Sequence, residues 1–319
     1  MKATAIAPSN IAFTKYWGRK DEKLRLPENG SISMCLSNLL TTTTVELSPI
    51  YSRDQINIEE PERIIKHLDR IRKIAKIEHK AKVVSHNNFP SGTGLSSSAS
   101  GFAALTLAAA TAAGLKLSEK QLSILARQGS GSACRSIPSG FVEWLDGNSS
   151  ETSYAKQIFP PDYWDITDVV AVVSEGKKEV STSVGQQSAK SSPFMKVRLT
   201  HMKEKNKLVK KLIKDKNFKE FGQLLEAEAL ELHTIMLTQY PPLIYWTPGT
   251  LIIMKFVSTW RAEGISVYFT INTGQNIHLI CEQKNVEKVK AKLKEVEEVK
   301  EIIINTPSEG TRLINSHLF

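Results

Sequence analysis

Three stretches rich in glycine and hydroxyl residues have the composition of anion-binding segments. The first runs from Phe89 to Gly101 and reads Phe-Pro-Ser-Gly-Thr-Gly-Leu-Ser-Ser-Ser-Ala-Ser-Gly, and a segment dominated by alanine and leucine continues to Ala113. That segment predicts a buried helix, so the loop leads into a helix N-terminus, where unpaired N–H groups and partial positive charge favour phosphate. The alternative is that the serines only cap a core helix, because the loop lacks the lysine of a P-loop.

The second stretch, residues 10–21, places aromatic side chains, cations and a glycine in a segment that we expect to be a loop. Lys15, Tyr16 and Arg19 in this stretch could supply charged and hydroxyl donors to a buried anion. A surface turn anchored by Trp17 is the alternative interpretation.

The third stretch, residues 129–144, surrounds Arg135 with small residues. Small residues allow the backbone to approach a ligand closely, and a guanidinium can hold a carboxylate or a phosphate through two parallel hydrogen bonds. The alternative is a glycine- and serine-rich turn that carries a surface arginine.

The elements expected around these stretches alternate between strands and helices. Apolar periodicity predicts strands at 2–7, 82–85, 141–144, 169–173, 265–271, 277–281 and 301–304, and a hairpin formed by 31–40 and 41–48. It predicts helices at 59–77, 118–127, 194–216, 218–237, 250–262 and 286–296. A polar run at 148–153 and the pair Pro160-Pro161 precede a boundary that we place near Ile166, giving two domains, 1–166 and 167–319.

Composition is that of an ordinary globular protein: 319 residues, 41% hydrophobic, 24% charged, with a net charge of +9. The densest basic cluster, residues 203–216, has leucines at helical spacing, so a solvated helix face is favoured over a nucleic-acid or membrane surface. Its three cysteines lack metal or redox spacing, and no stretch reaches about 18 apolar residues without polar interruption. We therefore expect a cytoplasmic protein without nucleic-acid or membrane partners. The spacing around His86 and His233 favours loop and core roles for these two histidines.

Taken together, the motifs resemble those of the diphosphomevalonate decarboxylases of the GHMP small-molecule kinase superfamily. The resemblance spans most of the chain and also includes Leu-Pro-Glu-Asn-Gly-Ser-Ile-Ser from Leu26 and Ser-Ser-Pro-Phe from Ser191. It implies an α+β fold with an N-terminal domain of the ribosomal S5 type and a C-terminal ferredoxin-like domain, with the site in the cleft between them. It also implies ATP with Mg²⁺, a phosphorylated mevalonate as substrate, and a homodimer.

The resemblance assigns roles to individual residues of this sequence. ATP would lie along 91–98, on Ser91, Gly92, Gly94, Ser96, Ser97 and Ser98, with Ser97 also a candidate Mg²⁺ ligand. The 5-phosphoryl end of the substrate would meet Tyr16, Arg19, Ser130, Ser132 and Thr182. Arg135 would hold the substrate carboxylate, Asn10 would orient it, and Lys15 would lie close to the reacting groups.

One segment departs from the family pattern. Where the family reads Asp-Ala-Gly-Pro-Asn, this chain reads Asn272-Thr273-Gly274-Gln275-Asn276, so an amide replaces the expected catalytic carboxylate. An amide cannot take a proton, and loss of a general base typically lowers a rate by about 10² to 10⁴. The favoured function is ATP-dependent decarboxylation of 5-diphosphomevalonate to isopentenyl diphosphate, ADP, phosphate and CO₂. The alternatives are a 5-phosphomevalonate decarboxylase, a kinase that phosphorylates the 3-hydroxyl and stops there, and a non-catalytic ligand-binding homologue.

Overall fold

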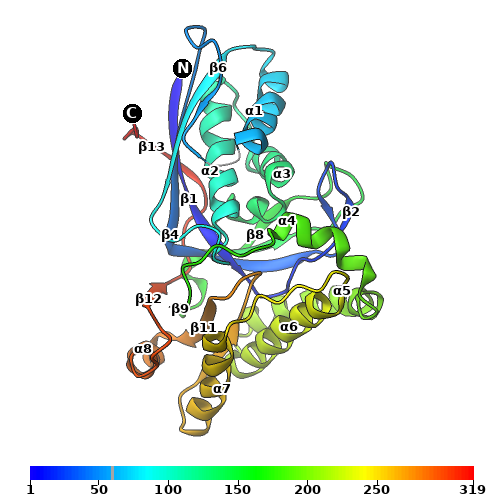
Figure 1. The fold of residues 1–319 in the computed structure, drawn as a ribbon, viewed down its shortest axis with the longest axis vertical. Helices are drawn as coiled ribbons and strands as arrows, with labels where there is room; N and C mark the ends of the chain where they lie inside the picture. Colours follow the sequence, from blue (N-terminus) through cyan, green and yellow to red (C-terminus); the bar gives the residue numbers. More distant parts are fainter. Residues whose placement is uncertain (59–60) are drawn as a thin grey trace.

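Two sheets organise the chain, whose computed structural model describes residues 1–58 and 61–319 (Figure 1). The larger sheet has seven strands: β1 (Lys2–Ala12), β4 (Ser31–Ser48), β5 (Gln55–Ile56), β6 (Lys80–Asn87), β7 (Phe141–Trp144), β8 (Ala155–Phe159) and β13 (Arg312–Ile314). The smaller has the order β10 (Val267–Thr270), β11 (Ile277–Glu282), β9 (Ile166–Val172) and β12 (Glu301–Asn305). A separate ribbon pairs β2 (Arg19–Asp21) with β3 (Leu26–Pro27). Together with the helices, these sheets confirm the expected α+β class.

The helices fall into two groups, one beside each sheet (Figure 1). Beside the larger sheet lie α1 (Pro61–Ala75), α2 (Ser97–Ala112), α3 (Glu119–Gly129) and the 3-10 helix Gly131–Ser136. The others are α4 (Thr182–Gly185), α5 (Met195–Lys214), α6 (Phe218–Thr238), α7 (Pro248–Ala262) and α8 (Val286–Lys294). Most lie within a few residues of the predicted ranges, although the predicted start of α1 at Glu59 is outside the described residues. None of the described helices combines the length and the apolar character that crossing a bilayer requires.

The alanine-rich helix α2 is the centre of the larger domain. Most of its side chains are short and none that is polar is larger than threonine, so it approaches β1 and β4 closely, and Ala103, Ala104 and Ala108 are completely buried. This packing fixes the N-terminal end of α2, and with it the preceding loop at 91–96, against the larger sheet.

The predicted hairpin at 31–48 is wrong, because these residues form the single strand β4. No glycine, proline or asparagine lies at Leu40 or Thr41 to turn the chain. The strand instead changes partner along its length: Ser31–Met34 pairs with β7, whereas Thr41–Ser48 pairs with β6. Strand β1 runs beside both parts and continues past Pro8, with a register shift between Pro8 and Asn10.

The two sheets share a continuous apolar core where they meet. Val170, Val172 and Ile280 on one face of the smaller sheet pack in the same cluster as Phe13 and Met34 of the larger domain. Strand β13 also returns from the end of the chain to pair with β1. The division of the chain into two domains at Ile166 remains a prediction. The shared core and the pairing of β13 with β1 hold the two parts of the chain together.

Candidate functional site

The serine-rich loop before α2 connects neighbouring segments and does not simply cap the helix. Ser96 has a left-handed backbone conformation and makes no capping hydrogen bond, and its hydroxyl accepts one from Asn272 Nδ2 at 3.1 Å. Ser97 Oγ accepts from the backbone N–H of Gly92 at 3.3 Å, and Ser98 Oγ donates to Ser130 Oγ at 3.0 Å. These contacts favour the ligand-binding interpretation over the capping alternative.

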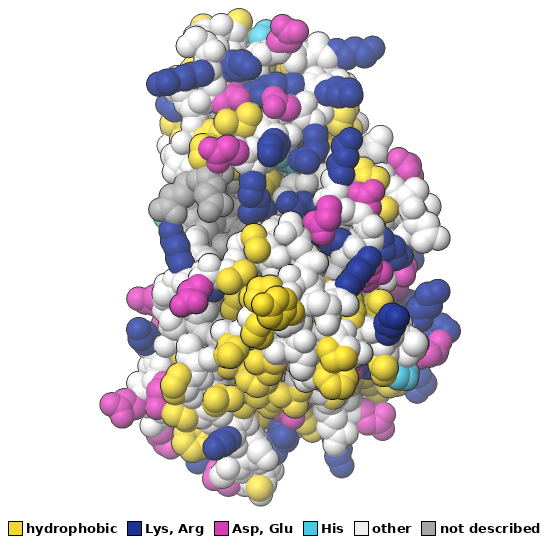
Figure 2. Space-filling model, turned by 45° about the vertical axis from the view of Figure 1, so that its right-hand side comes forward, with side chains coloured by type: hydrophobic (Ala, Val, Ile, Leu, Met, Phe, Trp, Pro, Cys, Tyr) yellow, Lys and Arg dark blue, Asp and Glu magenta, His cyan; other side chains and the backbone are white. Residues whose placement is uncertain are grey.

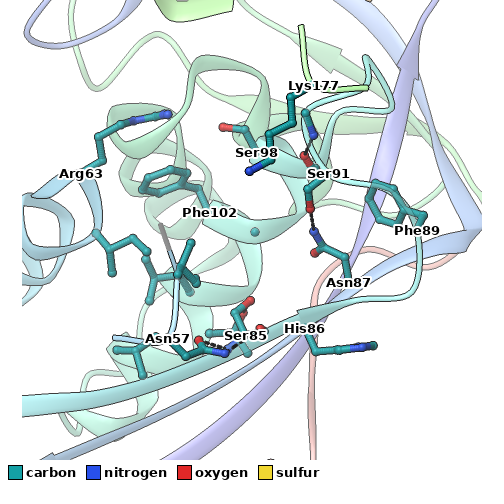
Figure 3. A pocket seen from close by; sticks show the side chains of 18 residues that line it. Asn57, Arg63, Ser85, His86, Asn87, Phe89, Ser91, Ser98, Phe102 and Lys177 are labelled. Carbon is teal, nitrogen blue, oxygen red and sulfur yellow. Dashed lines mark hydrogen bonds between the residues drawn. The ribbon is translucent and has the colours of Figure 1, made fainter. Parts of the chain in front are cut away.

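A cavity of about 600 Å³ opens beside this loop (Figure 3). Ser91, Gly92, Ser97 and Ser98, all predicted nucleotide-binding residues, line it. Figure 3 shows Arg63 of α1 and Lys177 toward one end of the cavity, and Asn57 and His86 toward the opposite end. Its size is typical of a pocket for a small molecule, and the N-terminus of α2 together with two cations suits a phosphate chain.

Two predicted nucleotide-binding residues, Gly94 and Ser96, are not among the residues that line this cavity and instead adjoin the 272–276 loop. Gly94 has a φ of +96°, and a Cβ atom placed on it would lie 2.6 Å from Gly274 Cα. The loops at 91–98 and 272–276 therefore touch through their backbones, and only glycine permits both the conformation and the contact.

Arg135 lies behind the loop and is 4% exposed. Its Nε and Nη2 donate to Asn10 Oδ1 at 3.2 and 3.1 Å, and its Nη1 donates to Ser31 Oγ at 2.8 Å. Burial lowers the pKa of this guanidinium. Within the described residues, the hydrogen-bond partners of Arg135 are neutral oxygens, so its charge has no carboxylate beside it.

Lys15 is a second buried basic side chain and is 1% exposed. Its Nζ donates to Ala12 O at 2.7 Å and to Asn272 Oδ1 at 3.2 Å, while Asn272 Nδ2 donates to Asn10 O at 3.4 Å. Burial lowers the pKa of Lys15 to about 7. Lys15, Asn10, Asn272 and Arg135 thus form one hydrogen-bonded group, which agrees with their predicted proximity.

Tyr16 and Arg19 form a neighbouring cationic group. Arg19 Nε donates to Tyr16 Oη at 2.9 Å, and burial raises the pKa of Tyr16. Arg19 Nη2 and Arg25 Nη1 both donate to Ser183 Oγ, at 3.3 and 3.0 Å. Arg25 and Ser183 were not predicted as site residues. The position of Arg25, directly before the turn that begins at Leu26-Pro27, could have indicated that it lies near Arg19.

The remaining predicted substrate-binding residues, Ser130, Ser132 and Thr182, contact neighbouring segments of the site. Ser130 contacts the nucleotide loop through Ser98, and the backbone oxygen of Ser132 accepts from Asn10 Nδ2 at 3.4 Å. Thr182 lies against the 272–276 loop, with its Oγ1 2.7 Å from Thr273 Oγ1. Its neighbour Ser183, not Thr182, contacts Arg19.

Two further residues position the 272–276 loop and were not predicted as site residues. Lys178 Nζ donates to Thr182 Oγ1 at 2.6 Å and to Thr273 O at 2.8 Å, and burial lowers its pKa to about 8. His233 lies 3.0 Å from Asn272 O through Nε2, which donates because a carbonyl oxygen can only accept, and burial lowers the pKa of the ring to about 3. The sequence placed His233 on an apolar helix face, but it did not reveal which loop the ring would contact.

The described residues contain no group of three or more histidine, cysteine, aspartate or glutamate side chains that could hold a metal ion. Mg²⁺ commonly binds through substrate phosphates with few protein ligands. A hydroxyl such as that of Ser97 beside a phosphate chain is compatible with this mode of binding.

These features define a class of protein. It has an α+β fold, a nucleotide-sized cavity beside a loop that leads into a buried helix, and a buried arginine and lysine behind that loop. Family models match the chain twice, as the diphosphomevalonate decarboxylase-like N-terminal domain over residues 7–155 and as the mevalonate 5-diphosphate decarboxylase C-terminal domain over residues 168–314. The chain belongs to the diphosphomevalonate decarboxylase family.

Individual relatives agree with this assignment. The chain is 36% identical to diphosphomevalonate decarboxylase of Candida albicans, over 90% of this chain and 86% of that one, and 34% identical to the human protein, over 86% and 75%. A solved structure of mevalonate diphosphate decarboxylase from Staphylococcus aureus superposes with a TM-score of 0.93 at 36% identity and covers 98% of both chains.

A structure described as MDDEF in complex with MVAPP, AMPPCP and magnesium has a TM-score of 0.93 at 37% identity and covers 99% of both chains. The expected family and its GHMP kinase fold are therefore confirmed.

Proposed function

We propose that this protein catalyses the ATP-dependent decarboxylation of 5-diphosphomevalonate to isopentenyl diphosphate, ADP, phosphate and CO₂. The observation that carries the proposal is the buried pair Arg135 and Lys15, whose side-chain hydrogen bonds go to neutral oxygens among the described residues. A buried guanidinium without a carboxylate partner is unfavourable unless a ligand supplies negative charge, and the same negative charge would favour the ammonium form of Lys15. A substrate with a carboxylate and phosphoryl groups supplies that charge.

We assign a part of the substrate to each side chain of this buried group. Arg135 binds the carboxylate, and Asn10 fixes the guanidinium through two hydrogen bonds to its Oδ1. Tyr16 and Arg19 receive the 5-phosphoryl end, together with Arg25. In this arrangement the tertiary 3-hydroxyl would lie near Lys15.

The nucleotide occupies the cavity of about 600 Å³, with its phosphates at the serine loop and Lys177. Mg²⁺ bound to these phosphates would neutralise charge on the transferring group, and Ser97 is the hydroxyl placed to contact it. The structure described as MDDEF holds MVAPP, AMPPCP and magnesium together, which supports this combination of ligands.

The test is to incubate the protein with Mg-ATP and 5-diphosphomevalonate and to assay ADP and CO₂ separately. We expect both products in equal amounts. ADP without CO₂ would contradict decarboxylation. Ligand-induced thermal stabilisation with neither product would favour a binding protein.

One observation favours a second function, phosphorylation of the 3-hydroxyl without decarboxylation. Departure of phosphate from C3 develops positive character on that carbon, which a nearby carboxylate would stabilise, whereas position 272 carries an uncharged amide bonded to Lys15. Accumulation of a 3-phosphorylated product would identify this function.

The number of phosphates at the 5-position is tested with the same assay. Tyr16, Arg19 and Arg25 could accommodate one or two phosphates. A higher kcat/KM for 5-phosphomevalonate than for 5-diphosphomevalonate would identify a monophosphate decarboxylase.

We also propose a homodimer that works in the cytoplasm. Figure 2 shows hydrophobic side chains gathered over the lower half of one face, and exposed apolar residues occur on α5, α6 and the turn after α6, including Val197, Leu237, Tyr240 and Ile244. The three cysteines are free thiols, which suits a reducing compartment. Light scattering should give twice the 35.5 kDa chain mass, and Ile244→Glu should halve it.

A further inference from the structure

The buried amide of Gln239, directly after α6, joins two segments of the site. Gln239 is 2% exposed, its Oε1 accepts from Trp17 Nε1 at 3.0 Å, and its Nε2 donates to Gly185 O at 2.9 Å. An indole N–H can only donate and a carbonyl oxygen can only accept, so these two partners fix which way the amide faces. Trp17 and Gly185 are also buried, and both hydrogen bonds are therefore shielded from water.

Each partner of Gln239 lies two residues from a member of the cationic group. Arg19 follows Trp17 by two positions, and Ser183 precedes Gly185 by two. Arg19 Nη2 donates to Ser183 Oγ at 3.3 Å, so the two segments meet a second time at this contact. The Gln239 amide and the Arg19–Ser183 contact therefore close a ring through both segments.

The two segments also pack tightly beside Gln239. A Cβ atom added to Gly185 would lie 2.4 Å from Leu243 Cδ1 and 3.3 Å from Trp17 Cη2, although the backbone of Gly185 is in the ordinary right-handed helical region. Trp17, Leu243 and Met236 belong to one buried apolar cluster. Close packing leaves the two segments little freedom to move apart while the hydrogen bonds of Gln239 are in place.

The contact that closes the ring carries two positive charges. Arg25 Nη1 donates to the same oxygen as Arg19, Ser183 Oγ, at 3.0 Å. Arg19 pairs with Glu22, whereas Arg25 forms no ion pair with a carboxylate of the described residues. Two guanidinium groups at one neutral oxygen repel each other, and a phosphoryl group bound between them would relieve that repulsion. A displacement of Ser183 would therefore alter the placement of both cations.

We propose that Gln239 is a positioning residue for the 5-phosphoryl end of the substrate. Its amide sets the distance between the segment that carries Arg19 and the segment that carries Ser183, and thereby the spacing of the groups that receive the phosphate. This inference rests on the proposed function. It adds a residue that acts through Trp17 and Gly185 and not by touching the substrate.

The first experiment is a calorimetric titration of Gln239→Leu with 5-diphosphomevalonate. Leucine supplies neither hydrogen bond of the amide. We expect Kd to rise about 10- to 100-fold, since small displacements of binding groups cause losses of that size. In the assay of ADP formation, kcat should fall by less than about threefold, because the reacting groups stay in place while binding weakens.

Asn305→Leu is the matched control. Asn305 is a completely buried amide whose Oδ1 accepts from Asn38 N, which joins β12 to β4. Its replacement should lower the melting temperature and leave Kd unchanged. Equal rises in Kd for Gln239→Leu and Asn305→Leu would mean that Gln239 acts only through general stability, and would overturn the proposal.

A double-mutant cycle distinguishes positioning from a structural role elsewhere. Ser183→Ala removes the hydroxyl at which the two segments meet. In the Ser183→Ala protein, Gln239→Leu should change Kd by less than about threefold, so the two substitutions should not be additive. Fully additive effects would overturn the proposal.

Trp17→Phe tests the same link if Gln239→Leu does not fold. It removes the indole N–H that Gln239 accepts and keeps an aromatic ring in the apolar cluster. We expect Kd to rise about 2- to 10-fold, and to rise less in the Ser183→Ala protein. An unchanged Kd would overturn the proposal.

Failure of the proposed function gives a different result. An unaltered protein that neither binds 5-diphosphomevalonate nor forms ADP with it would overturn the proposed function, and this inference with it. An unaltered protein that binds the substrate no more tightly than Gln239→Leu and Trp17→Phe would overturn only this inference.

Discussion

The two halves of the site differ in how far their side chains are already constrained. The nucleotide half is an open cavity in which Ser91, Ser98 and Lys177 are exposed. The inner half is buried, and Arg135 and Lys15 are fixed by hydrogen bonds before any ligand arrives. Preorganised buried charges interact strongly because water does not screen them, so we expect substitutions in the inner half to have the larger effects.

The largest effect should come from Arg135→Ala. Loss of a buried, hydrogen-bonded charge typically costs about 2 to 5 kcal/mol in binding, equivalent to about 30-fold to several thousandfold. Calorimetric titration with 5-diphosphomevalonate measures it. Arg312→Ala, at an exposed ion pair with Glu309, is the control and should leave affinity unchanged. If the Arg135→Ala protein binds the substrate as tightly as the unaltered one, the inner half is not more sensitive to substitution than the nucleotide half.

Gly94→Ala tests the backbone contact between Gly94 and Gly274, at which the nucleotide loop meets the 272–276 loop. A left-handed alanine costs about 1 to 2 kcal/mol, and forcing the loop away from Gly274 adds about 1 to 3 kcal/mol. Gly264→Ala is a matched control, since Gly264 has a φ of +89° but no atom within 4 Å of an added Cβ. The melting temperature and kcat/KM should fall more for Gly94→Ala, and equal losses would mean that the loops need not touch.

The free energy of unfolding should depend on pH through Lys15, the buried lysine of the inner half. The pKa of Lys15 is about 7 when folded and 10.5 as a free side chain, so between these values the unfolded chain binds the extra proton. Stability should therefore rise with pH across this window, by up to about 1.4 kcal/mol per pH unit. Urea unfolding at pH 7.5 and 9 measures the slope, which Lys15→Met should reduce. The same slope in both proteins would mean that Lys15 is charged when folded.

The smallest effect should come from Lys177→Ala in the open half. An exposed cation contributes less than about 1 kcal/mol, so KM for ATP should rise only severalfold and salt should reduce the difference. KM for 5-diphosphomevalonate should not change, and Lys219→Ala, exposed on α6, should alter neither. A loss as large as that of Arg135→Ala would show that the open half is equally constrained.

The local pattern of the sequence was sufficient to predict most of the elements. Apolar periodicity located α5, α6 and α7 to within a few residues, and Ser118 begins α3 with the capping box that its spacing to Gln121 allows. The residue pattern predicted a hairpin at 31–48 and was wrong there. These residues stay extended as one strand because its first part pairs with β7 and its second part with β6. They also gave no signal for β13, a short strand whose existence depends on the free edge of β1.

The sequence by itself determined which chemistry this protein carries: the hydroxyl loop, the arginine among small residues, and the amide at 272 are fixed by residue type. Only the tertiary structure decided which groups meet. The Lys15–Asn272 contact joins residues 257 positions apart, and the Ser98–Ser130 and Lys178–Thr273 contacts likewise join segments distant in the chain. The physical reason is that a side chain's type is local, whereas its burial, and with it the charge state of Lys15, depends on the packing of both domains around it.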